Sequence, residues 1–295
     1  MGTDDTSLAV TSVDRTPNLA KEFGRAVLTA RGRPGGRGTL PRAGLEQRGV
    51  SVDRDLLVRY QRLCGYDVSD SLPATFPHLL GFPLQAQLMA AADFPLPLPG
   101  LVHIANRTTV HRALSATDTL DVRVHAENLR PHAKGSTVDL LASASIDGEV
   151  VWDSTSTYLH RGKPTGPVAD RPKAPTLTAP RLSGVWRLPA DLGRRYAAIA
   201  GDVNPIHLHP LTAKAMGFPR AIAHGMFTYA RSLAAIGPRT MAPNTSRVWF
   251  AKPVLLPSSV ALRLDAASTA DRAVAELVAK KNPDKRHLTL EVDWS

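Results

Sequence analysis

A carboxylate and an imidazole lie close together in the segment Gly201-Asp202-Val203-Asn204-Pro205-Ile206-His207. Adding water to a conjugated double bond needs a base that takes a proton from water and an acid that supplies one to the α-carbon, and these two side chains can do both. Pro205 disfavours a helical conformation at Asn204, so the segment is predicted to be an ordered turn rather than a helix face. The sequence therefore predicts that Asp202 and His207 act together on one water molecule.

A second feature with chemical potential is the segment Ala223-His224-Gly225-Met226, which opens an apolar run to Ile236. The run is predicted to be a helix that begins at Gly225, and helix N-termini present backbone N–H groups without helical partners. Such donors can stabilise negative charge on a thioester oxygen. Glycine, which has no Cβ, also lets a substrate come close.

Each of these residues also has an ordinary structural interpretation. Asp202 and Asn204 suit turns, Gly225 suits a helix start, and His207 could be a hydrogen-bonded core histidine. A zinc site built from three histidines is a further alternative, with His207, His209 and His224 as its ligands. No other cluster supports a metal site, so no metal or other cofactor is expected.

The chain divides near its middle into two related halves. Residues 161–180 contain five prolines and few apolar residues, as an extended linker does. When the first half is shifted along the second by one fixed number of residues, the first offset, three features coincide. They are Tyr60 with Tyr196, Gly65 with Gly201, and Gly81-Phe82-Pro83 with Gly217-Phe218-Pro219. A second, slightly longer offset superposes 120–124 on 260–264. These matches predict two copies of one structural unit.

The elements expected in each copy are helices followed by alternating strands. Asp53 is predicted to cap a helix that ends near Cys64. Alternation of apolar and polar residues predicts antiparallel strands at 120–129, 136–146, 149–160, 247–254, 259–266, 272–280 and 285–294. One helix against a bent antiparallel sheet, present twice, is an α+β arrangement.

Composition sets broad limits. The 36 Lys and Arg residues against 26 Asp and Glu residues give a net charge of +10, which favours anionic partners. Binding of nucleic acid rests on this charge alone and is not expected. The segment from Arg31 to Arg37 is interpreted as a flexible basic loop, with anion binding as the alternative. One cysteine, acidic residues at Asp4 and Asp5, and no stretch of membrane-spanning length predict a cytoplasmic protein.

The catalytic segment resembles the signature of the MaoC-like family of (R)-specific enoyl thioester hydratases. That signature has an aromatic residue, then Gly-Asp-x-Asn-Pro-aliphatic-His and a small residue, which are here Tyr196, Gly201, Asp202, Asn204, Pro205, Ile206, His207 and Ala213. The departure is Ala200, where the pattern usually has Ser, Thr, Gly or Cys. The resemblance extends over most of residues 50–295 and implies a double hotdog fold.

By this resemblance the chain interconverts trans-2-enoyl thioesters and (3R)-hydroxyacyl thioesters carried by coenzyme A or acyl carrier protein. Asp202 and His207 would be catalytic, Gly225 would form the oxyanion hole, and Asn204 and His224 would bind substrate. Expected units are a basic extension (1–45), a catalytically silent hotdog (46–160), a linker (161–180) and a catalytic hotdog (181–295). The oligomeric state stays open, a homodimer included.

The first copy is expected to be silent because the first offset places Tyr66, Ser71 and Leu88 where the second copy has Asp202, His207 and His224. The apolar, proline-rich segment from Phe82 to Leu101 is a candidate wall of an acyl tunnel, with core packing as the alternative. Two other functions are weighed. Hotdog thioesterases place an acidic residue on or near the central helix, and residues 225–236 contain none. A non-catalytic acyl-thioester binding protein would not need the acid–base pair.

Overall fold

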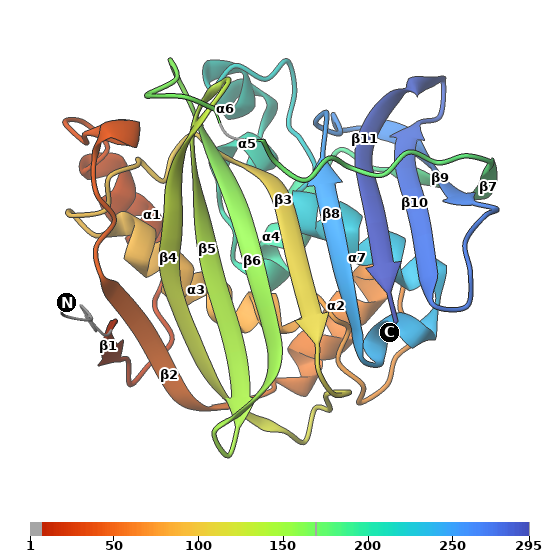
Figure 1. Cartoon of the computed structure of the whole chain (residues 1–295), viewed down its shortest axis with the longest axis horizontal. Coiled ribbons are helices and arrows are strands. Elements are labelled where there is room, and N and C mark those ends of the chain that lie inside the picture. Colours follow the sequence, from red (N-terminus) through yellow and green to blue (C-terminus); the bar gives the residue numbers. More distant parts are fainter. Residues whose placement is uncertain (1–7, 169, 295) are drawn as a thin grey trace, which may run out of the picture.

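The computed structural model of the chain describes residues 8–168 and 170–294. Asp4 and Asp5, on which part of the expectation about location rests, lie outside the described residues. Within the described ranges the strands form one sheet in the order β1-β2-β4-β5-β6-β3-β8-β11-β10-β9-β7, and the helices lie on one side of it (Figure 1). No helix in this part of the chain is long and apolar enough to cross a membrane.

The strands divide between the two halves of the sequence. Those of the first half are β1 (Ala9–Ser12), β2 (Ala43–Ser51), β3 (Leu101–Val110), β4 (Thr119–His132), β5 (Gly135–Ile146) and β6 (Glu149–Arg161). Those of the second half are β7 (Pro180–Leu188), β8 (Asn244–Phe250), β9 (Ser258–Asp265), β10 (Arg272–Ala279) and β11 (Asn282–Asp293). All seven strands expected from alternation are present, and β1, β2, β3 and β7 are additional.

The helices fill the concave side of the sheet. They are α1 (Leu19–Leu28), α2 (Arg54–Cys64), α3 (Pro77–Ala90), α4 (Leu192–Ala200), α5 (Pro205–Leu208), α6 (Pro210–Ala215) and α7 (Gly225–Ile236). In the first half α3 packs on β2, β4 and β5, and in the second half α7 contributes buried side chains to the core that the strands cover. A central helix wrapped by a bent, mainly antiparallel sheet, present twice, is the α+β double hotdog that the sequence predicts.

Strands β3 and β8 join the two halves into one sheet. They pair antiparallel with Arg107 opposite Arg247, and the second offset, which superposes 120–124 on 260–264, also superposes these two arginines. Equivalent residues face each other only where a twofold axis passes between them. The two copies therefore pair about a pseudo-twofold axis at the centre of the sheet.

Helices α2 and α4 meet close to the same axis. Both end in a glycine with left-handed backbone conformation, Gly65 with φ of 80° and Gly201 with φ of 71°, as helix C-caps often do. Tyr60 and Tyr196, one from each helix, are buried with ring centroids 6.3 Å apart. Asp53 caps α2 by accepting a hydrogen bond from the N–H of Leu56, as predicted.

Beyond these two glycines the first offset, which superposes Tyr60 on Tyr196, fails. Gly81 to Pro83 lie inside α3, whereas Gly217 to Pro219 lie in the loop after α6. The helix of the second half that is equivalent to α3 is α7. The residue equivalent to His224, the N-cap of α7, is therefore Phe76, the N-cap of α3, and not Leu88. The second half holds α5 and α6 between its paired helices, and the described first half has no helix there.

The segment before the first hotdog strand packs against the first half. Strand β1 pairs with β2, and α1 packs on α3. Arg33 is not part of a flexible loop, because its guanidinium donates hydrogen bonds to the carbonyl oxygens of Thr29, Met89, Phe94, Leu96 and Ala90. Its donors are thus directed at the C-terminal end of α3 rather than at an anion.

Candidate active site

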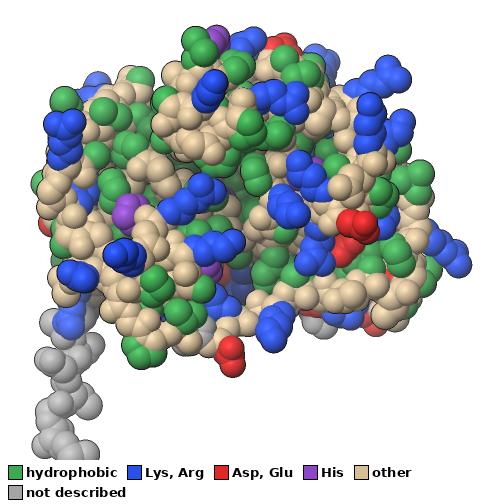
Figure 2. Space-filling view, turned by 90° about the horizontal axis from the view of Figure 1, so that it is seen from above, with side chains coloured by type: hydrophobic (Ala, Val, Ile, Leu, Met, Phe, Trp, Pro, Cys, Tyr) green, Lys and Arg blue, Asp and Glu red, His purple; other side chains and the backbone are tan. Residues whose placement is uncertain are grey.

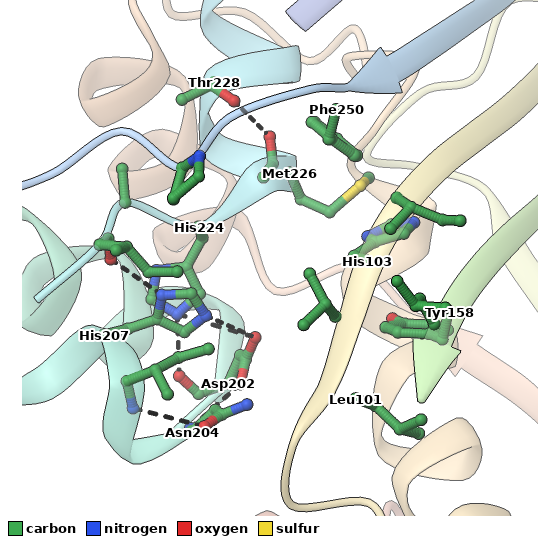
Figure 3. Close-up of a pocket in the computed structure, with 18 of the residues that line it drawn as sticks. Leu101, His103, Tyr158, Asp202, Asn204, His207, His224, Met226, Thr228 and Phe250 are labelled. Carbon is green, nitrogen blue, oxygen red and sulfur yellow. Dashed lines mark hydrogen bonds and ion pairs between the residues drawn. The ribbon is translucent and has the colours of Figure 1, made fainter. Parts of the chain in front are cut away.

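One pocket of about 410 Å³ lies between the halves, and Asp202, Asn204, His207, His224 and Gly225 all line it. Figure 3 shows Asp202, His207 and His224 on one side of it and His103 and Tyr158 on the other. The catalytic segment comes from the second half, while α3, β3 and β6 of the first half form the opposite wall. The pocket thus depends on both copies of the fold.

The loop from Gly201 to Asn204 places the carboxylate at the pocket. Helix α4 ends at Gly201, and the chain then turns so that the Asn204 N–H donates to Asp202 Oδ1 at 3.1 Å. The expectation of a turn throughout was wrong for its last part, since α5 begins at Pro205 and carries His207. Proline suits the first position of a helix because its missing N–H would have no helical partner there.

His207 is held in one tautomer by the backbone. Its Nδ1 lies 2.9 Å from the carbonyl oxygen of Ile222, which can only accept a hydrogen bond, so Nδ1 carries the proton. The lone pair of Nε2 then points toward Asp202 Oδ2 at 4.0 Å. Two acceptors at this distance do not bond directly, but a donor placed between them can bond both.

His224 ties the catalytic loop to the start of α7. Its Nε2 donates to the carbonyl oxygen of Asp202 at 3.0 Å, and its ring stacks on that of His207 with centroids 3.7 Å apart. Tyr196 also packs on His224, with ring centroids 4.9 Å apart. His224 therefore fixes the backbone at Asp202 and the plane of the His207 ring at once.

Burial keeps both imidazoles of this cluster neutral. It lowers the pKa of His207, although the Asp202 carboxylate and the hydrogen bond to Ile222 oppose this change. Burial likewise lowers the pKa of His224 well below its usual value, and the neighbouring His207 adds to the effect. At neutral pH the site thus holds a carboxylate beside two uncharged rings, and His207 Nε2 can accept a proton.

The remaining predicted residues occupy distinct places. Gly225 is the first residue of α7 and lines the pocket. Asn204 also lines it, but its side-chain oxygen is used to cap α5 by accepting from the Ile206 N–H at 3.4 Å. His209 is exposed, and its Nδ1 accepts from the Leu211 N–H in α6, so it is not part of the site.

A metal-binding arrangement differs from the one that the sequence suggests. Asp202 takes the place of His209, because one ligand atom each from Asp202, His207 and His224 lie within 4.8 Å of one another. The Nε2 of His224, however, carries the proton that it donates to the Asp202 carbonyl, so this atom has no lone pair for a metal. The arrangement fits water activation better than metal coordination.

Sequence reasoning missed Gly193, which lets α5 approach α4. A Cβ at Gly193 would lie 1.9 Å from the carbonyl oxygen of His207, far inside van der Waals contact. Position 193 precedes the recognised motif, and no spacing rule connects it to His207. Only the packing of the two helices reveals that this glycine positions His207.

Sequence reasoning also missed part of the wall across the pocket, formed by His78, His103, Tyr158 and Phe250. The His103 ring lies 4.6 Å from that of Tyr158 and 5.2 Å from that of Phe250, measured between centroids. The predicted wall segment does contribute, since Phe82, Met89, Leu98 and Leu101 line the pocket. The first half thus supplies much of the pocket lining, although the segment from Gly201 to His207 belongs to the second half.

Cationic side chains surround the mouth of the pocket. Lys134, Arg161 and Lys252 are among its lining residues, and Figure 2 shows Lys and Arg side chains gathered around a hollow on this face. Positive charge at the rim of a cleft attracts anionic ligands. A ligand with an apolar part and a phosphate-bearing part fits this distribution.

A comparison with protein families matches the part of the chain that holds Asp202 and His207. Residues 164–285 match the family model described as MaoC like domain. The chain is 38% identical to 3-hydroxyacyl-thioester dehydratase X of Mycobacterium tuberculosis over 226 residues, which are 76% of this chain and 80% of the relative. The resemblance inferred from the motif is thereby confirmed.

Solved structures agree on the fold. The structure of HtdX from Mycobacterium tuberculosis matches with a TM-score of 0.74 and 34% identity, over 84% of this chain and 98% of that one. A MaoC-like dehydratase from Phytophthora capsici matches with a TM-score of 0.71 and 16% identity, over 91% of this chain and 97% of that one. The second likeness concerns the fold alone.

The close contact at Gly193 gives a first prediction. Gly193→Ala should lower the free energy of unfolding by about 1–3 kcal/mol, as overpacking does, and should lower turnover because the His207 carbonyl must move. Gly24→Ala in α1 is the matched control, since a Cβ there meets nothing within 4 Å. That control should gain about 0.5–1 kcal/mol from helix propensity. Equal behaviour of the two variants in urea unfolding would contradict the packing argument.

The buried histidines give a prediction about pH. Burial lowers the pKa of His78 to about 4 and that of His103 to about 3, and it lowers those of His207 and His224 as well. Below pH of about 6.5 the unfolded chain takes up protons that the folded chain does not, so stability is full above that pH and falls below it. Each histidine that stays neutral in the folded chain should make the free energy of unfolding fall by about 1.4 kcal/mol for each pH unit below that value.

Urea unfolding at pH 7, 6 and 5 measures this slope. His78→Phe should reduce the slope between pH 6 and 5 by the share of one histidine, because it removes a group with a large pKa difference between the two states. An unfolding free energy independent of pH in this range, or an unchanged slope in the variant, would show that the buried rings are not held neutral.

Proposed function

The chain belongs to the family of MaoC-like dehydratases, and we propose that it interconverts trans-2-enoyl thioesters and (3R)-hydroxyacyl thioesters, with Asp202 and His207 as its catalytic residues. The observation that carries this proposal is the pair of facing acceptors, Asp202 Oδ2 and His207 Nε2, 4.0 Å apart in a pocket. A water molecule has two protons to offer, and this pair can accept both.

Water held in this way is oriented for attack. With both protons directed at Asp202 and His207, the oxygen lone pairs face the pocket, where C3 of an enoyl thioester would lie. As the C3–O bond forms, one proton passes from water to the acid–base pair and one proton is delivered from the pair to C2. Dehydration is the same path in reverse.

The start of α7 supports the other half of the reaction. Negative charge develops on the thioester oxygen while C3 is attacked, and fixed N–H donors lower the energy of that state. Gly225 is the first helical residue, so its N–H has no partner within the helix. We assign the oxyanion hole to this N–H. We also propose that His224 and Asn204 position the catalytic loop, in addition to any contact that they make with the substrate.

The distribution of charge and apolar surface supports the substrate class. The apolar side chains of the first half suit an acyl chain, and the cationic rim suits the phosphate that coenzyme A and the prosthetic group of acyl carrier protein share. A thioesterase is disfavoured because α7 carries no acidic residue. A purely binding protein would not need the tautomer of His207 to be fixed toward Asp202.

Loss of either proton-transfer group tests the mechanism. Asp202→Asn and His207→Ala should each lower the hydration of crotonyl-CoA by about 10²–10⁴-fold, the usual contribution of a positioned acid or base. The assay follows the disappearance of the conjugated enoyl absorbance, and circular dichroism checks that each variant is folded. Near-normal turnover in either folded variant would exclude the pair as catalytic.

Matched controls come from the first half, whose catalytic silence is part of the proposal. Tyr66 follows the cap of α2 as Asp202 follows the cap of α4, and Ser71 lies in the corresponding loop. Tyr66→Phe and Ser71→Ala should leave kcat within about threefold, since neither side chain is asked to move a proton; tenfold would correspond to about 1.4 kcal/mol. A loss as large as that of Asp202→Asn would give the first half a role in the chemistry.

The stereochemistry of the product is a separate prediction. Hydration should give a single enantiomer, because Asp202 and His207 lie on one side of the pocket and hold water against one face of the substrate. The resemblance to (R)-specific hydratases implies that this enantiomer is the (3R)-hydroxyacyl thioester. Chiral chromatography of the hydrolysed product measures the outcome. A (3S) product would mean that the substrate presents its opposite face to Asp202 and His207.

A further inference from the structure

The wall opposite the catalytic pair carries polar side chains that the hydration reaction does not use. His78, Phe82, Gln85 and Met89 follow one face of α3 at spacings of three and four residues. His78, Phe82 and Met89 line the pocket, and Gln85 lies between two of them on the same face, fully buried. The face of α3 that meets the acyl-binding space thus alternates apolar and polar groups.

Several polar atoms of this wall have no partner among the described residues. They are Nδ1 of His78, both amide atoms of Gln85 and Nε2 of His103, each of which is buried. Buried polar groups are nearly always hydrogen-bonded, because leaving one unpaired costs about 1–3 kcal/mol. Two of these side chains, His78 and His103, line the pocket, and the third, Gln85, lies on the same face of α3 as His78. Unpaired polar atoms at this place indicate that the wall is built to meet a polar group.

The two histidines of the wall lie together and face the site. His78 and His103 stack with ring centroids 6.4 Å apart, and His103 is held between Tyr158 and Phe250. Figure 3 shows His103 and Tyr158 across the pocket from Asp202. Because aromatic packing fixes the His103 ring, its buried Nε2 is a preorganised group rather than a mobile one.

The charge of the wall limits what it can bind. Burial lowers the pKa of His78 to about 4 and that of His103 to about 3, so both rings are neutral at pH 7. A neutral imidazole offers one donor and one acceptor, and an amide offers both kinds as well. Such groups suit a hydroxyl or a carbonyl, whereas a carboxylate beside them would meet neutral rings and an amide but no cation among these three side chains.

We propose that His78 and His103, with Gln85 behind them on α3, form a subsite for a hydroxyl group on the acyl chain of the thioester substrate. The inference rests on the proposed function for the identity of the substrate. It adds that the acyl chain is not a plain hydrocarbon beyond the reacting carbons. A chain that lacks the oxygen leaves the polar atoms unpaired, and sites of this kind discriminate strongly against such analogues.

The test compares matched substrates. Trans-2-enoyl-CoAs of the best-accepted chain length are assayed with a plain tail and with a single hydroxyl at each position from C5 to the chain end. At least one hydroxylated substrate should show a kcat/KM about tenfold or more above that of the plain one, and that ratio should fall to about one in His78→Phe and in His103→Phe. Met89→Leu, an apolar change on the same face of α3, is the matched control and should keep the ratio.

A binding measurement separates this inference from the proposed function. Calorimetric titration of Asp202→Asn with saturated acyl-CoA and with its hydroxylated counterpart reports the preference without turnover. Tighter binding of the hydroxylated ligand, lost in the double variant with His78→Phe, supports the subsite even if no enoyl thioester is hydrated. Equal or weaker binding at every hydroxyl position, or a ratio that the two histidine substitutions leave unchanged, overturns the subsite while hydration of crotonyl-CoA would still stand.

Discussion

Two imidazole-to-carbonyl hydrogen bonds are the constraint on which the rest of the site depends. His207 donates a hydrogen bond to the carbonyl oxygen of Ile222, and His224 donates one to that of Asp202. Both rings are thus fixed by backbone oxygens that can only accept. The first bond turns the lone pair of His207 toward the carboxylate, and the second holds the backbone of that carboxylate in place. Removing either bond would leave the residues present but not the facing pair of acceptors.

These bonds are available because the second half departs from the symmetry of the fold. The two halves share central helices, capped helices and a pseudo-twofold axis between β3 and β8. Between α4 and α7, however, the second half inserts α5 and α6, and this insertion brings His207 to the N-terminus of α7. The described first half lacks the insertion and supplies the opposite wall instead. A difference in one connection between two otherwise similar units thus accounts for the position of this site.

Burial gives this arrangement its electrostatic character. His78, His103, His207 and His224 are all largely buried, and desolvation lowers the pKa of each ring. The buried rings of the pocket are therefore uncharged, while three cations that line the pocket, Lys134, Arg161 and Lys252, lie at its mouth. A neutral ring has one nitrogen that can accept a proton or a hydrogen bond, whereas a charged ring in the same place could only donate.

The sequence alone determined the local features of the site, because these depend on residues close together in the chain. The motif from Gly201 to His207, the helix start at Gly225 and the strands with alternating residues are all of this kind, as is the family resemblance confirmed by the relatives. Only the tertiary structure decided the rest. The contacts of Gly193 with His207 and of His224 with the Asp202 carbonyl follow from packing, as does the position of Asp202 and His207 across the pocket from a wall of the other half of the chain. The first offset between the halves failed for the same reason: an insertion changes the count along the chain, while the fold pairs helices by shape and burial.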